Sequence, residues 1–227
     1  MYRLGRAQIQ STEQALPLTI AGLKAWYDAS DASSFTYSSG TLVSQWNDLS
    51  GQGRHISQGS VGAQPSRSGA QNGQSTVVYG AGTSLTVAVA PSVAMPLTTL
   101  GVVRWDGGGA SNTQWIRLAS SQIAYVAGTA YALYGGLVLA GGTPGTTWHQ
   151  WSLKMNGVTS QIWADGASQA TGTEGPGASM SEISVGATVS VNVWRGEVAE
   201  VIIYGADLAA ADRLALEQYL KNKWATP

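Results

Sequence analysis

Two glutamates near the end of the sequence, Glu197 and Glu200, are the paired carboxylates that lie on a predicted strand. Two carboxyl groups about 5 Å apart on one side of a cleft can hydrolyse a glycosidic bond, one as nucleophile and the other as acid. Side chains alternate between the faces of a strand, so a spacing of three places this pair on opposite faces unless a bulge intervenes. We therefore expect no hydrolytic pair and no enzyme, with Glu197 solvated and Glu200 satisfied by backbone or by an arginine.

A second acidic group, formed by Asp28, Asp31 and Asp48, lies in two polar turns near the start of the sequence. Carboxylate oxygens gathered in this way could bind Ca²⁺. Aspartates in turns also accept hydrogen bonds from nearby backbone N–H groups, and that role is the commoner one. His55 and His149 lack the spacing of a metal site. Calcium is therefore the one cofactor that the sequence allows, and no other is predicted.

Four tryptophans, Trp105, Trp115, Trp148 and Trp163, are candidates for a carbohydrate site. An indole ring can stack on the apolar face of a sugar when it is exposed on the surface of a sheet. Packing inside the fold is the competing explanation for each of the four. The sequence alone leaves both roles open.

Composition excludes several classes of partner. The chain has 227 residues, of which 44% are hydrophobic and 11% charged, and its formal net charge is −1. Proteins that bind nucleic acid or anionic membranes need clustered Lys and Arg, which this sequence lacks. There is no cysteine, which suits a reducing cytosol. Met1–Thr19 carries Arg3 and Arg6 without the apolar stretch of a secretory signal, so we expect synthesis in a cytoplasm without secretion.

Alternating hydrophobicity, Gly-rich turns and β-branched runs predict an all-β protein. An Asn156-Gly157 pair between Thr146–Met155 and Val158–Ala164 predicts a hairpin with a type I′ turn. On its first strand, His149 and Trp151 belong to the predicted core face, whereas Gln150 and Ser152 belong to the solvated one. The other predicted strands are Gly22–Asp28, Ser75–Tyr79, Ser84–Val89, Leu97–Trp105, Gln114–Ala119, Gln122–Val126, Gly136–Leu139, Glu182–Ala187 and Val191–Tyr204, and Phe35–Leu49 is predicted to form a loop and a short strand.

The last predicted element is an amphipathic helix from Ala210 to Trp224. Its apolar residues recur at spacings of three and four, which gives one stripe that can dock on the sheet. The predicted stripe consists of Leu214, Leu216, Tyr219, Leu220 and Trp224, and the predicted solvent face of Arg213, Glu217, Lys221 and Lys223.

Residues 1–20 are predicted to form an N-terminal arm, and residues 21–227 a single domain. The arm has no sustained hydrophobic period, and its apolar and basic side chains are too sparse to fold alone. They are suited to becoming ordered against a partner. The residues proposed for this contact are Arg3, Leu4, Arg6, Ile9 and Leu16.

Three motifs resemble one known family. They are AWYDASD at Ala25–Asp31, WNDLSGQG at Trp46–Gly53, and GEVAEVIIY at Gly196–Tyr204 with the helix that follows. In this order they resemble the laminin-G-like branch of the concanavalin A-like lectin/glucanase superfamily, over roughly Ala21 to Trp224. One departure is Ala209, where the family usually has Ser or Thr to cap the helix.

The resemblance implies a two-sheet antiparallel jelly-roll sandwich with one C-terminal α-helix. It also implies a non-catalytic structural or adhesion module of a large assembly, for which we expect a bacteriophage virion: a capsid decoration, fibre or tail protein. The expected partners are other virion proteins, copies of itself, and cell-surface glycans. A free carbohydrate-binding lectin is the alternative, and a glycoside hydrolase ranks third because paired carboxylates on one face are not predicted.

Overall fold

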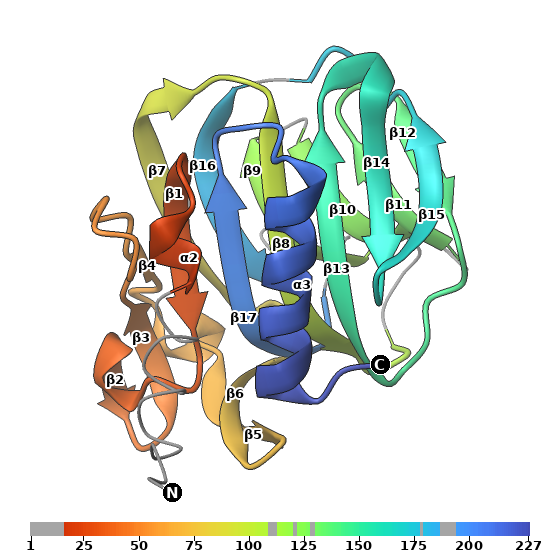
Figure 1. The fold of residues 1–227 in the computed structure, drawn as a ribbon. Coiled ribbons are helices and arrows are strands. Elements are labelled where there is room, and N and C mark those ends of the chain that lie inside the picture. Colours follow the sequence, from red (N-terminus) through yellow and green to blue (C-terminus); the bar gives the residue numbers. More distant parts are fainter. Residues whose placement is uncertain (1–15, 109–112, 120–121, 128–129, 178, 187–193) are drawn as a thin grey trace, which may run out of the picture.

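The computed structural model describes residues 16–108, 113–119, 122–127, 130–177, 179–186 and 194–227. Its strands form two antiparallel sheets packed face to face, with one long helix on the outside (Figure 1). The predicted jelly-roll sandwich with a C-terminal helix is confirmed. Arg3, Leu4, Arg6 and Ile9 of the predicted arm lie outside the described residues.

The front sheet is the one that carries the helix. Strand β17 lies at its centre, with β8, β13, β14 and β15 following in order on one side and β1 and β6 on the other. These strands are β1 (Leu23–Asp28), β6 (Gln74–Tyr79), β8 (Leu97–Trp105), β13 (Trp148–Met155), β14 (Ser160–Ala164), β15 (Ala167–Gly172) and β17 (Gly196–Tyr204).

The back sheet runs in the order β4, β7, β16, β9, β10, β11 and β12. Its strands are β4 (Ile56–Ser57), β7 (Ser84–Val93), β9 (Thr113–Ala119), β10 (Gln122–Ala127), β11 (Ala130–Tyr134), β12 (Val138–Gly141) and β16 (Met180–Gly186). Strand β3 (Leu42–Trp46) pairs with β2 (Phe35–Ser39), with β4, and with β5 (Ser66–Gln71), which itself pairs with β6. The β2–β5 region therefore joins the two sheets along one edge.

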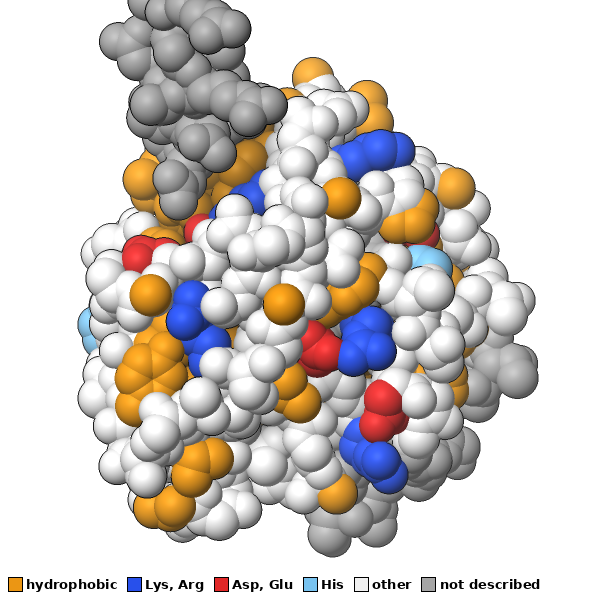
Figure 2. All heavy atoms as spheres, turned by 90° about the horizontal axis from the view of Figure 1, so that it is seen from below, with side chains coloured by type: hydrophobic (Ala, Val, Ile, Leu, Met, Phe, Trp, Pro, Cys, Tyr) orange, Lys and Arg blue, Asp and Glu red, His pale blue; other side chains and the backbone are white. Residues whose placement is uncertain are grey.

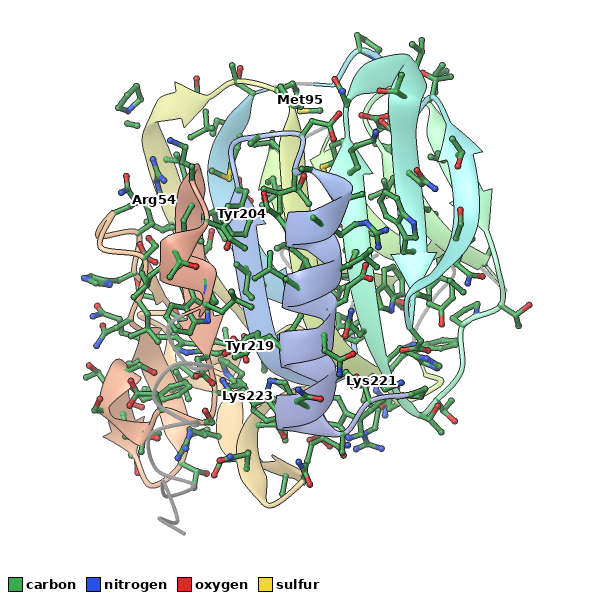
Figure 3. All side chains as sticks on the ribbon, viewed as in Figure 1. Arg54, Met95, Tyr204, Tyr219, Lys221 and Lys223 are labelled. Carbon is green, nitrogen blue, oxygen red and sulfur yellow. The ribbon has the colours of Figure 1, made fainter. Side chains whose placement is uncertain are left out.

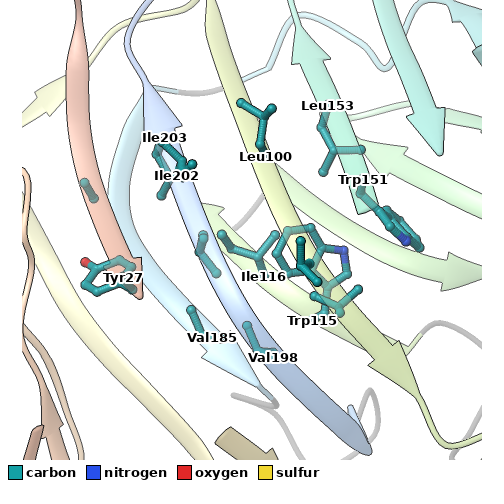
Figure 4. Close-up of a cluster of buried hydrophobic side chains, with 14 of the residues drawn as sticks. Tyr27, Leu100, Trp115, Ile116, Trp151, Leu153, Val185, Val198, Ile202 and Ile203 are labelled. Carbon is teal, nitrogen blue, oxygen red and sulfur yellow. The ribbon is translucent and has the colours of Figure 1, made fainter. Parts of the chain in front are cut away.

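The core lies between the sheets and is built around aromatic rings (Figure 4). Trp151 packs edge-on against Trp115 and Tyr131, with ring centroids 5.9 and 4.3 Å apart. A β-carbon at Gly101 would lie 2.5 Å from the Trp115 ring, so only glycine fits there. Because Gly101 faces inward, its neighbours Leu100 and Val102 on β8 face the outer side of the front sheet, which we call the outer face.

Helix α3 (Ala210–Trp224) covers the central part of the outer face, over β17, β8 and β13 (Figure 1). Its start and end are as predicted, and the methyl group of Ala209 offers no side-chain cap. The predicted stripe is wrong at Leu214, which is 52% exposed. The predicted solvent face is wrong at Glu217, which is buried. Lys223, also predicted to face water, has an 11% exposed side chain and points toward the sheet.

Helix α3 also buries one face of the predicted hairpin. Gln150 and Ser152 of β13 were expected on a solvated face, and both are buried because the helix lies over them. The predicted type I′ turn is wrong. Asn156 has φ −153°, and the connection is a four-residue loop that contains a 3₁₀ turn at Gly157–Thr159. A type I′ turn needs positive φ at both central residues.

The described part of the predicted arm packs on the domain. Leu16–Thr19 forms a short helix, α2, whose Leu16 contacts the core. The Pro17 carbonyl accepts a hydrogen bond of 2.9 Å from the hydroxyl of Tyr204. Leu16 is therefore a packing residue of this domain, which corrects its assignment to a free arm.

The surface is largely uncharged, as the composition indicates. On the face shown in Figure 2, a few basic and acidic side chains, some of them next to one another, lie among uncharged atoms. Among the described residues, no helix is long and apolar enough to cross a membrane.

Candidate functional site

The motifs from the two ends of the sequence meet at one buried carboxylate, Glu200. Its two oxygens accept hydrogen bonds from the Trp26 and Trp224 indoles, at 2.8 and 2.7 Å, and from the Tyr219 hydroxyl at 2.8 Å. The Lys223 ammonium lies 2.7 Å from Oε2. Tyr219 and Lys223 extend from the side of α3 that faces β17 and β1 (Figure 3). This cluster fastens α3 to the sheet.

Lys223 also bonds Asp28 at 2.5 Å, so one cation lies between two carboxylates whose residues are 1% and 0% exposed. Burial raises the pKa of Glu200 above its usual range, and the neighbouring Lys223 charge opposes that rise. The hydroxyl of Tyr219 has a raised pKa because it is buried beside Glu200 and Asp28. Both carboxylates of the cluster are therefore almost completely buried.

Glu197 and Glu200 lie on the same face of the sheet, which corrects the prediction of opposite faces. Glu197 pairs with Arg104 and Glu200 with Val102, two positions apart on β8, because a bulge lies between Val198 and Glu200. Glu197 is buried and not solvated as expected: it forms an ion pair with Arg104 and accepts a bond from Thr76. Both carboxylates are therefore held by other side chains.

The three aspartates proposed for calcium cap backbone groups. Asp28 Oδ1 accepts from the Ser30 N–H, and Asp31 Oδ1 from the Ser33 N–H, each at 2.9 Å. Asp48 accepts backbone N–H bonds from three residues, Trp26, Ser50 and Arg54, at 2.9 to 3.0 Å. Within the described ranges, no group of three or more His, Cys, Asp or Glu side chains could hold a metal ion. A calcium site at these aspartates stays a prediction.

The four candidate tryptophans have different surroundings. Trp115 is fully buried in the core, so it presents no face to a ligand, which corrects its candidacy. Trp105 and Trp148 are half-buried and pack against the core, and the Trp105 indole N–H donates to the Gly108 carbonyl at 2.9 Å. Trp163 lies on the outer face, paired with Ser152 on β13. The structure does not bring these four rings together.

Trp163 borders a cavity of about 230 Å³ beside the start of α3, which we call the helix-start pocket. Its floor comes from outer-face residues of β8, β13 and β14, and its wall from the segment that leads into α3 and from the first turn of that helix. The lining residues are Thr98, Lys154, Gln161, Trp163, Asp207, Leu208, Ala210 and Arg213.

The polar side chains of the pocket are partly held by one another. Asp207 Oδ2 accepts a bond from the Asn156 amide at 3.1 Å and lies 3.5 Å from the Lys154 ammonium. The Arg213 guanidinium lies over the Trp163 ring, 4.2 Å from its centroid, and forms an ion pair with Glu217. These contacts hold two donors, Lys154 and Arg213, and one acceptor, Asp207, in place around the Trp163 ring.

Such a mixture is suited to a saccharide. Sugar hydroxyls both donate and accept hydrogen bonds, and the pocket offers a carboxylate acceptor, ammonium and amide donors, and an indole. Sequence reasoning identified Trp163 alone among these residues. Lys154, Asp207 and Arg213 were missed because they come from three separate elements that only the fold brings together.

The sequence matches no protein-family model and no curated protein. The structure resembles Trypanosoma rangeli sialidase in complex with sialic acid, with a TM-score of 0.59 and 15% identity. The alignment covers 98% of this chain and 40% of the sialidase, so the chain spans about two fifths of that protein.

Two further solved structures are similar. Domain 4 of AbnA, a GH43 extracellular arabinanase from Geobacillus stearothermophilus solved with arabinotriose, has a TM-score of 0.56 and 14% identity over 87% of this chain and 98% of that domain. The binding domain of botulinum neurotoxin DC in complex with SialylT has a TM-score of 0.61 and 9% identity over 88% of this chain and 52% of that chain. At these identities the likeness defines the fold class, a β-sandwich, and not the function.

Proposed function

We propose that this protein is a non-catalytic carbohydrate-binding module that attaches a larger assembly to a glycan through the helix-start pocket. The observation that carries the proposal is the position of this pocket. Helix α3 covers the centre of the outer face, and the pocket lies beside it, where Trp163 and Gln161 project from β14.

Two further observations support the proposal. The similar structures named above include complexes with sialic acid and with arabinotriose, so related sandwiches occur in saccharide-binding proteins. Glu197 and Glu200, the pair considered for hydrolysis, are buried in ion pairs, which favours binding without turnover. The finer assignment to a bacteriophage virion rests on the sequence resemblance and stays a prediction, as do the virion partners and localisation.

Trp163→Ala should weaken saccharide binding by about tenfold or more, because the variant loses one wall of the pocket and the support for Arg213. A glycan array with the wild-type protein would first identify a bound saccharide. Isothermal titration with that saccharide would then compare wild type and variant, and the saccharide should be recovered without cleavage.

Tyr37→Ala is the matched control, because Tyr37 is a 38% exposed aromatic on β2, at the other edge of the sandwich (Figure 1). Its affinity should equal that of the wild type. Thermal melting of both variants would show that each is folded. An array without any bound glycan, or unchanged affinity in Trp163→Ala, would refute the proposed site.

A further inference from the structure

The two cations of the helix-start pocket differ in how closely they are paired. Arg213 forms a tight ion pair with Glu217, whereas Lys154 and Asp207 form a looser pair of 3.5 Å. The Asp207 oxygen that lies nearest Lys154, Oδ2, also accepts a bond from the Asn156 amide.

The Lys154 ammonium has N–H groups that are available for a ligand. Its side chain is 20% exposed, and its ammonium lies 3.5 Å from Asp207. Its three N–H groups make no hydrogen bond with any described residue, and 3.5 Å is longer than the 2.7–2.9 Å of a charge-assisted bond. A ligand anion in the pocket could therefore bond Lys154 directly without displacing a partner.

Arg213 adds a second donor group in a fixed position. Its guanidinium lies between the Trp163 ring and Glu217, and the side chain is 13% exposed. The hydrogen bond to Glu217 uses Nη1, whereas a guanidinium has five N–H groups in one plane. Because its side chain is held on two sides, it loses little freedom when a ligand binds.

We infer that the saccharide bound in the helix-start pocket is acidic, a uronic or sialic acid residue whose carboxylate is bonded by Lys154 and approached by Arg213. This inference rests on the proposed function and names its ligand class. The hydroxyls of the sugar ring then meet Gln161 and Asp207, and its apolar face meets Trp163. A neutral sugar of the same shape offers the Lys154 ammonium no anion besides Asp207.

The test uses pairs of sugars that differ in the carboxylate: glucuronic acid with glucose, galacturonic acid with galactose, and sialyllactose with lactose. Titrations of the full chain at low salt should show that one acidic member binds at least tenfold more tightly than its neutral partner. The preference should shrink as salt is added, because ions screen the charge at this partly exposed site.

Lys154→Met should weaken binding of the acidic sugar about tenfold and change the neutral one less than twofold, since methionine keeps most of the apolar stem. Lys221→Met, on the exposed side of α3, is the matched control and should change neither. Equal binding of acidic and neutral members, or equal losses of both in Lys154→Met, overturns the inference and leaves the proposed function standing. Failure of every sugar to bind overturns both.

Discussion

Glu200→Ala should destabilise the protein by about 3–5 kcal/mol, the usual cost of removing one partner of a buried ion pair. The change leaves two indole N–H groups and the Lys223 ammonium without their shared acceptor in a fully buried position. The total stability of a domain is about 5–15 kcal/mol, so the loss is a large fraction of it. Urea unfolding followed by tryptophan fluorescence would measure the difference.

Glu182→Ala is the control for that experiment. Glu182 also forms an ion pair, with Arg117 at 2.6 Å, but its side chain is 27% exposed. Exposed pairs contribute about 0–1 kcal/mol, so this variant should unfold close to the wild-type midpoint. A Glu200→Ala variant as stable as Glu182→Ala would show that the buried cluster does not fasten α3 to the sheet.

The strands and the terminal helix were predictable because their signals are local. Leu97–Trp105 is a run rich in Leu, Val and Thr, which favour strands, and Ala210–Trp224 has the three- and four-residue spacing of a helix. Both elements occupy the predicted residues. Strands β4, β5, β11 and β15 were missed. Ser66–Gln71 and Ala167–Gly172 are rich in small and polar residues and lack the alternating pattern of half-buried strands.

The errors on polar residues share one cause, which is that a partner distant in sequence decides whether a side chain is buried. Glu200 and Gln150 are covered because α3 lies over the outer face. The bulge that turns Glu197 and Glu200 to one side depends on the pairing of β17 with β8. The periodicity of a single strand predicts neither the burial under α3 nor the bulge.

The candidate site was predicted at one residue for the same reason. Trp163 could be selected from its type and its place on a strand. Lys154 and Arg213 resemble ordinary surface charges in the sequence, and Arg213 was assigned to a solvated helix face. They become parts of a pocket only when β13 and α3 are placed side by side.

Truncation of the chain before Leu208 should abolish cooperative folding and give an aggregating product. The cut removes the four buried hydrophobic residues of α3: Leu216, Tyr219, Leu220 and Trp224. At about 1.5–3 kcal/mol for each large side chain, their burial contributes an amount comparable with the stability of a whole domain. It also exposes Leu100, Val102 and Ile202 on the outer face. Size-exclusion chromatography and calorimetry would measure the loss.

Two point variants test whether the loss of stability comes from the packing of α3 or from shortening the chain. Leu220→Ala removes a fully buried side chain and should cost about 2–5 kcal/mol. Leu214→Ala, on the same helix but 52% exposed, should stay within about 0.5 kcal/mol of the wild type. If the truncated chain melts cooperatively and the two variants are equally stable, the sandwich folds without α3. The helix would then act only as a wall of the pocket, through Ala210 and Arg213.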